Sequence, residues 1–232
     1  MKTELQERIP GANIARRSFL RYAGIGVASA GLLATAACHK DHKIKVQPDG
    51  IDIGITGDMA ILNYVYAVEQ LEAAFYTQLL LTPYAGITAD EIASFTSIRD
   101  HDVVHREFFK TALGGKAIPE LVIDLSSLDF TTRPSVLTAA KVFKDMGIRA
   151  YDGIGYLIAT ETYLTIVGKI VSVEARHSAL ISNITAFGTF AGNDQVDGNG
   201  FNKSSTISEI LLMINPYFKI KVNAVNYGYV AS

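Results

Sequence analysis

The sequence predicts an all-α protein, in which an antiparallel four-helix bundle with one long crossover between its second and third helices precedes a short C-terminal extension. Four long segments place apolar residues at helical spacing. The first two segments are joined by a short connection, as are the last two, whereas the middle connection is long. The second and fourth segments each contain an acid-x-x-His unit, whose two side chains lie on one face of a helix. We expect an export signal over residues 1–38, a tether over 39–57, the bundle over 58–190 and the extension over 191–232.

The amino end resembles a twin-arginine export signal. Arg16 and Arg17 precede a weakly apolar, small-residue run over 24–37, which is too short for a confident membrane span. Cys38 is the only cysteine, so no internal disulfide can form, and the small residues before it suit lipoprotein-type cleavage with acylation of Cys38. Ordinary cleavage after Ala37, leaving a free thiol, is the alternative. We expect an envelope protein on the periplasmic side of a membrane, anchored through lipidated Cys38.

Composition excludes some classes of partner. The 232 residues carry a formal charge of −2, and residues 1–37 contribute five basic and two acidic side chains, so the remainder carries 16 basic and 21 acidic side chains, or −5. That balance favours neither nucleic acid nor an anionic membrane surface as a partner. No nucleotide-binding glycine loop, nucleophile elbow or zinc-finger spacing is present in the sequence.

The first two helices are expected at 58–81 and from Thr88 to about Gly114. The first carries Glu69 and Tyr76 on its apolar stripe, and Pro83 follows its end. The second begins with a Thr-x-x-Glu capping box at Thr88 and stops at a glycine pair, where a left-handed cap costs little. Asp102 and His105 lie at its middle, three residues apart.

The last two helices are expected from Thr132 to about Ile158 and over 162–187. Pro134 stands in the first turn of the third helix, although three glycines weaken the end of that helix. The fourth has an inward stripe that includes Glu174, His177 and Leu180. Beyond the bundle we expect an extended crossover segment at 121–125, a short helix at 207–214 and extended chain over 218–230.

Two facing helices with acid-x-x-His units can direct four ligands to one point, as a dinuclear metal site in a bundle requires. Three sequence blocks then carry a family resemblance: residues 62–76, residues 147–153 and residues 173–177. Together they resemble the ferritin-like domain proteins that include the desiccation-related proteins. The wider superfamily, with rubrerythrins and manganese catalases, binds two iron or manganese ions in the bundle core, and pairing of bundles into homodimers is common in it.

The resemblance implies a set of site residues. The implied metal ligands are Glu69, Asp102, His105, Glu174 and His177, and Tyr76 is implied as a core tyrosine that modulates electron transfer. Relatives place a further glutamate three residues before the glycine of the second block, where this chain has Lys144. A protonated lysine has no lone pair and repels a cation, so the ligand set is reduced.

Lys144 leaves two interpretations open. In the first, Asp145 or a water completes the shell and iron or manganese still binds, in the limit a single ion, with oxidation of ferrous iron or consumption of peroxide as the activity. In the second, Lys144 neutralises the acids in place of a metal, and the protein is a non-catalytic envelope stress or interaction module. Glu72 is expected to be a flanking carboxylate, and His101 a solvated surface residue.

Overall fold

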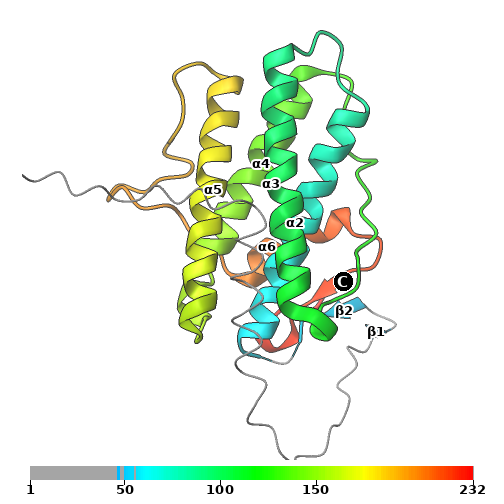
Figure 1. The fold of residues 1–232 in the computed structure, drawn as a ribbon, viewed down its shortest axis with the longest axis vertical. Helices are drawn as coiled ribbons and strands as arrows, with labels where there is room; N and C mark the ends of the chain where they lie inside the picture. The colour runs from blue at the N-terminus through cyan, green and yellow to red at the C-terminus, as the bar shows by residue number, and fades with distance from the viewer. Residues whose placement is uncertain (1–45, 48–49, 55, 232) are drawn as a thin grey trace, which may run out of the picture. The chain divides into compact units, whose positions relative to one another are not determined.

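The computed structural model describes residues 46–47, 50–54 and 56–231. The twin-arginine segment, Cys38 and most of the expected tether lie outside these residues. Four long helices, α2 (Asp58–Leu81), α3 (Ala89–Leu113), α4 (Arg133–Asp152) and α5 (Glu161–Thr185), form the bundle (Figure 1). The prediction of an all-α four-helix bundle is thus confirmed. No helix among the described residues is long and apolar enough to span a membrane.

Helix α2 is the centre of the bundle. It packs most extensively against α3 and also contacts α4 and α6 (Ile207–Ile214), whereas α4 packs mainly against α5. Because three neighbours surround α2, every position from Ala60 to Ala73 is buried, and the helix has no solvent-facing polar stripe there. The carboxylates of Glu69 and Glu72 are therefore held entirely within the protein.

Helices α3 and α6 both begin with a capping box. The Thr88 hydroxyl accepts a hydrogen bond from the Glu91 N–H, and the Glu91 carboxylate accepts one from the Thr88 N–H, which is the capping box predicted for α3. Thr206 and Glu209 form the same box at α6. These local bonds fix where each helix begins.

Two helix ends differ from the expectation. Helix α4 stops at Asp152 instead of continuing to Ile158, and a short 3₁₀ turn follows at Gly155–Leu157. Ser205 lies against this helix end, because its N–H donates to the Arg149 carbonyl at 3.1 Å and a Cβ on Gly153 would lie 1.9 Å from its carbonyl oxygen. Helix α5 ends at Thr185, and Leu180, expected on its inward face, is 38% exposed.

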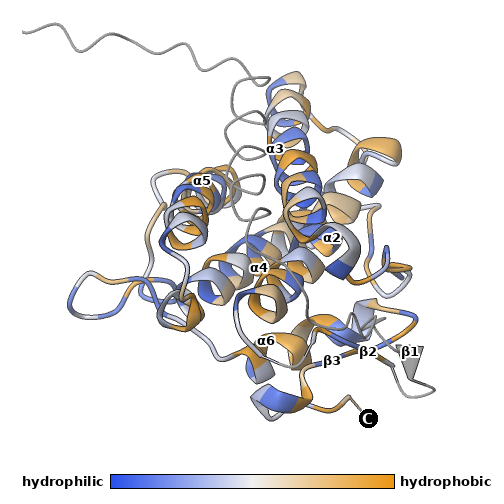
Figure 2. Ribbon diagram, turned by 60° about the horizontal axis from the view of Figure 1, so that its bottom comes forward, coloured by the Kyte–Doolittle hydropathy of each residue, from blue (hydrophilic) through white to orange (hydrophobic). Residues whose placement is uncertain are grey.

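A small sheet and α6 close one side of the bundle (Figure 2). The strands lie in the order β1 (Val46–Gln47), β2 (Gly50–Asp52) and β3 (Val222–Asn223). Strand β1 pairs antiparallel with β2, and β2 pairs parallel with β3. This sheet was not predicted. The expected extended crossover is present in part, because Ile123 forms an antiparallel bridge with Phe218.

Side-chain amides from α2 fix the crossover against the bundle. The Asn63 amide donates to the carbonyls of Ile53 and Lys116 and accepts from the Ile118 N–H at 2.8 Å. Gln70 Oε1 accepts from the Leu121 N–H at 2.6 Å. Helix α2 thus pairs backbone groups at the buried points of the crossover, Ile118 and Leu121, which have no secondary-structure partner there.

Candidate metal centre

Seven ionisable side chains from all four long helices meet in the core, and we call them the buried cluster: Glu69 and Glu72 from α2, Asp102 and His105 from α3, Lys144 from α4, and Glu174 and His177 from α5. The four carboxylates and the lysine are fully buried, and the two histidines are at most 7% exposed. Each helix contributes from its middle or its inward face, so the helical spacing that buries the apolar stripe also buries these groups.

The Lys144 ammonium occupies one half of the buried cluster, which we call the ammonium half. Its Nζ atom donates to Glu72 Oε2, Asp102 Oδ1 and Glu174 Oε2, at 2.7 Å in each case. Three donors of one ammonium thus meet three carboxylates, one from each of the other helices. Gly147 makes room for this contact, because a Cβ there would lie 2.5 Å from Glu72 Oε1.

The other half, which we call the imidazole half, is centred on His105. Its Nδ1 atom lies 3.0 Å from Glu174 Oε1 and 3.7 Å from Glu69 Oε1. The Tyr151 hydroxyl donates a short hydrogen bond to Glu69 Oε1. Glu174 therefore belongs to both halves, with one oxygen toward Lys144 and the other toward His105.

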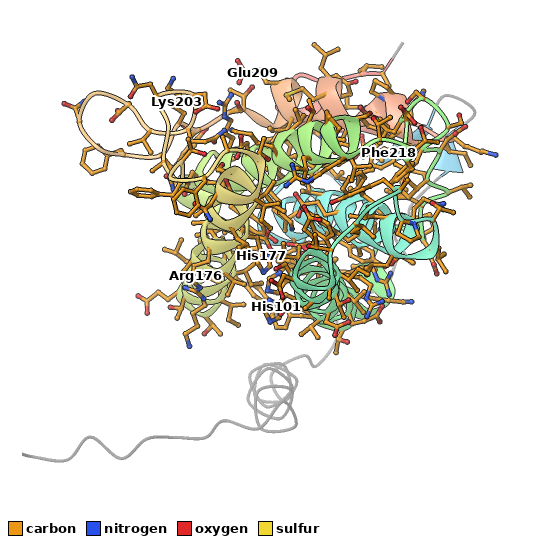
Figure 3. The ribbon with its side chains drawn as sticks, turned by 90° about the horizontal axis from the view of Figure 1, so that it is seen from above. His101, Arg176, His177, Lys203, Glu209 and Phe218 are labelled. Carbon is orange, nitrogen blue, oxygen red and sulfur yellow. The ribbon has the colours of Figure 1, made fainter. Side chains whose placement is uncertain are left out.

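His177 faces the ammonium half and, on its other side, the protein surface. Its Nδ1 atom lies 3.4 Å from Glu174 Oε2 and 3.6 Å from Asp102 Oδ1. Its Nε2 atom lies 2.9 Å from Nδ1 of the exposed His101, and the two rings are stacked (Figure 3). His101 is exposed, as expected for a solvated residue, and it is also the outer partner of His177, which was not expected.

Burial and charge set opposite protonation tendencies within the buried cluster. Burial raises the pKa of Glu72 and of Asp102 well above the ordinary carboxyl values, and the nearby Lys144 only partly offsets this. Burial would likewise raise the pKa of Glu174, but Lys144 and the two histidines hold that pKa well below its usual range.

The two histidines of the buried cluster differ in charge. Burial alone would lower the pKa of His105, but the charges and hydrogen bonds of Glu69 and Glu174 raise it to about 10. Burial, assisted by the Lys144 charge, lowers the pKa of His177 to about 4, although Glu174 acts in the other direction. His105 is therefore a cation at neutral pH and His177 is neutral.

Some oxygens of the buried cluster have no hydrogen-bond donor within the described residues, and they fit a cation. Glu69 Oε2 and Asp102 Oδ2 are both buried and accept no bond. One ligand atom from each of Glu69, Asp102, His105 and Glu174 lies within 4.8 Å of every other. The donor set of oxygens and one imidazole nitrogen suits iron or manganese.

A family model described as a ferritin-like domain matches residues 57–186. The chain belongs to the ferritin-like domain family. No curated protein matches the chain. A ferritin-like fold with a buried carboxylate and histidine cluster is compatible with a di-metal site, and the family match agrees with the predicted helical bundle.

The structure brings the five expected ligands, Glu69, Asp102, His105, Glu174 and His177, together in one place. Other expected residues lie differently. The Asp145 carboxylate turns to Ser178, at 2.6 Å, and to Lys141, so it faces away from the buried cluster of this ferritin-like bundle. The Tyr76 ring lies 5.5 Å from Lys144 Nζ, and its buried hydroxyl has no hydrogen-bond partner among the described residues.

Sequence reasoning placed Glu72 beside the site only as a flanking carboxylate, and it did not identify Tyr151 or His101 as neighbours of the buried cluster. Glu72 lies three residues after Glu69, on the same helix face, so the i, i+3 rule that selected the acid-x-x-His units was already a signal for it. His101 lies four residues before His105, but its partner is on α5. No spacing within one helix could have shown that contact.

Proposed function

We propose that this ferritin-like protein is a non-catalytic module of the cell envelope, in which the Lys144 ammonium takes the position of one metal ion. One observation carries the proposal: the fully buried Nζ atom lies 2.7 Å from three carboxylates on three helices. A cation coordinated by the same oxygens would have to occupy the volume that the ammonium fills. Two-ion redox chemistry, which needs both positions, is then blocked by a side chain of the protein itself.

The ammonium also explains how the acids are tolerated in the core. A buried carboxylate without a partner is strongly unfavourable, and it is held only where charge and hydrogen bonds compensate it. In this chain Lys144 supplies both, with one donor for each of Glu72, Asp102 and Glu174. The ionic network keeps a polar core without requiring a metal in the ammonium half.

The test is turnover of the wild-type protein and of Lys144→Glu. Each is loaded anaerobically with ferrous iron and then exposed to oxygen or to hydrogen peroxide, and iron oxidation is followed by absorbance against a protein-free control. We expect the wild-type rate to equal the protein-free rate. A wild-type rate above that of the protein-free control, or equal to that of Lys144→Glu with both proteins active, would refute the proposal.

Oxidation of ferrous iron or consumption of peroxide is the second candidate. The observation that favours it is the pair of buried oxygens, Glu69 Oε2 and Asp102 Oδ2, that accept no hydrogen bond within the described residues. Those atoms, with His105 and Glu174, remain available to iron or manganese, and the buried Tyr76 hydroxyl has no hydrogen-bond partner within the described residues. The same turnover measurement decides between the two candidates.

Localisation in the envelope is part of the proposal and rests on the sequence of the amino end. Arg16 and Arg17 would direct export, and acylation of Cys38 would anchor the chain. Cell fractionation with a labelled fatty acid tests both. We expect labelled protein in the membrane fraction, and Cys38→Ser should move it to the soluble envelope fraction without label. Unlabelled wild-type protein would contradict the anchor, and retention in the cytoplasm would contradict export.

A further inference from the structure

A pocket of about 300 Å³ lies between α4 and the segment 186–206 that connects α5 to α6, which we call the connecting segment. That volume is at the lower end of the range for small-molecule sites. None of the residues that line the pocket belongs to the buried cluster. Its wall includes Lys141, Val142, Met146 and Arg149 from α4, Asp194 from the connecting segment and Met213 from α6.

A carboxylate of the protein itself lies in the charged part of this pocket. Lys141 Nζ donates to Asp194 Oδ2 at 2.6 Å, and the Arg149 guanidinium donates to the Asp194 backbone carbonyl. The hydrogen bond from Lys141 holds the pKa of Asp194 below its usual range, and the charge of Arg149 acts in the same direction. The pocket therefore favours an anion. Because the Asp194 side chain is 58% exposed, its ion pair with Lys141 is weak and can be exchanged.

Arg149 has a donor that the protein does not use. Its Nε atom is buried and has no hydrogen-bond partner within the described residues. A buried donor without an acceptor is unfavourable, and a carboxylate is the acceptor that best suits the planar fork of a guanidinium. The carboxylate of a bound molecule would thus find one donor at Arg149 Nε and, in place of Asp194, a second at Lys141.

The charge and the apolar wall of the pocket narrow the class of ligand. Lys141 also pairs with Asp145, so the pocket contains two cations and two carboxylates and is neutral. Displacement of the Asp194 carboxylate leaves one positive charge, which matches a monoanion. Val142 and the two methionines provide an apolar wall for the rest of the molecule. A short aliphatic monocarboxylate meets both requirements.

We propose that this pocket binds a short aliphatic monocarboxylate. Its carboxylate takes the place of the Asp194 carboxylate on Lys141 and accepts a hydrogen bond from Arg149 Nε, and its chain lies against the apolar wall. The connecting segment need not unfold for this exchange, because the Lys203 N–H donates to its Gln195 carbonyl at 2.8 Å and holds the segment to itself (Figure 3). The site does not depend on the proposed function, since it uses no residue of the buried cluster.

Methionine methyl groups report on the pocket directly. Met146 and Met213 line it, whereas Met59 lies in the first turn of α2. The wild-type protein, isotopically labelled at its methionine methyl groups, is titrated with sodium hexanoate at neutral pH and constant ionic strength and followed by nuclear magnetic resonance. We expect saturable shifts of the Met146 and Met213 resonances and no shift of the Met59 resonance. The absence of saturable shifts at both pocket methionines would overturn the proposal.

Two substitutions test whether Asp194 competes with the ligand, and both positions are partly exposed, so neither change threatens the fold. Asp194→Asn should strengthen hexanoate binding about threefold, which corresponds to the loss of a weak competing ion pair. Lys141→Met should weaken binding at least about tenfold, because it removes a charged donor. Asp197→Asn is the matched control from the same segment and should leave the affinity unchanged, since the Asp197 carboxylate accepts from the Asn199 and Phe201 N–H groups. Unchanged or weaker binding by Asp194→Asn, or unchanged binding by Lys141→Met, would overturn the proposal.

Three related molecules test the class of ligand. Hexan-1-ol has the chain without the charge, acetate has the charge without the chain, and inorganic phosphate is an anion of another class. Each should bind more weakly than hexanoate. Equal affinity for hexan-1-ol would show an apolar pocket without a carboxylate site, and equal affinity for acetate would show that the apolar wall has no role. Tighter binding of phosphate would show that the pocket selects another anion, and each of these three results would overturn the proposal.

Discussion

Replacing Lys144 by methionine removes the ammonium and keeps most of the side-chain volume. The change leaves Glu72, Asp102 and Glu174 buried without their shared donor. Removal of one partner from a buried ion pair costs about 3–5 kcal/mol, because the remaining charge is uncompensated. For a folding unit of this size, that corresponds to a fall in melting temperature of roughly 6–20 °C.

The pH dependence of the loss follows from the pKa shifts. Lys144 holds the pKa of Glu174 below its unfolded value, so this carboxylate stabilises the fold above pH 4.5, and the contribution is lost as the pH falls through the folded pKa. In Lys144→Met that contribution disappears, and burial raises the pKa of all three carboxyls. Raised carboxyl pKa values make the fold less stable as the pH rises. The stability gap between wild type and Lys144→Met should therefore be wider at pH 8 than at pH 5.

Urea unfolding in the presence of a chelator measures this gap without a contribution from metal. Lys141→Met is the matched control one turn earlier in α4, since Lys141 is partly exposed and pairs with Asp145 and Asp194 near the surface. The control should lose no more than about 1 kcal/mol. A loss below that value for Lys144→Met, or a gap that narrows from pH 5 to pH 8, would refute the reasoning.

Three further substitutions test other parts of the structure by thermal and urea unfolding. Gly147→Ala should destabilise the protein by more than about 1 kcal/mol, because its Cβ would meet the Glu72 carboxylate at 2.5 Å. Gly168→Ala, in open space on α5, should stabilise it by about 0.5–1 kcal/mol. Equal effects at the two glycines would contradict the close approach at Gly147. Asn63→Ala should cost roughly 2–4 kcal/mol, because it removes three hydrogen bonds to buried backbone, and a loss under 1 kcal/mol would show that water replaces them. Asp58→Asn should reduce stability at pH 7 and leave it unchanged at pH 2. Burial would raise the pKa of Asp58, but hydrogen bonds from the Ala159 and Thr160 N–H groups outweigh it and lower that pKa, so the carboxylate stabilises the fold above pH 3.8 and this stabilisation is lost as the pH falls. A loss of stability of the same size at both pH values would rule out this explanation.

Local rules predicted most of the bundle. The start of α3 follows from Thr88 and Glu91, three residues apart, and the apolar stripe of α2 gives its bounds, because both signals lie within one helix. The end of α4 was predicted too far along the chain, and the residue that contacts this end, Ser205, is distant in sequence and gives no local signal. The small sheet was missed for the same reason: strands of two or three residues carry no periodic signal, and β2 and β3 pair across most of the sequence.

The candidate site was predictable as a set of positions and not as a set of contacts. Neighbouring residues of a helix point about 100° apart, so only one of Lys144 and Asp145 could face the buried cluster. The sequence left both in consideration, and the packing of α4 selects Lys144. The division of Glu174 between Lys144 and His105 depends on side-chain positions from three helices, which no spacing encodes.

Helix α6 has a practical consequence for anyone who expresses the protein in parts. Its apolar residues Ile207, Ile210, Leu211 and Ile214 are buried, although the family match ends at residue 186. Asn215 at its end donates to the Val222 carbonyl and to the Tyr229 hydroxyl, which secures the final turns of the chain. A fragment trimmed to the matched residues would expose the apolar surface of α2 and α4 that α6 covers, so the smallest soluble fragment should extend to about residue 231.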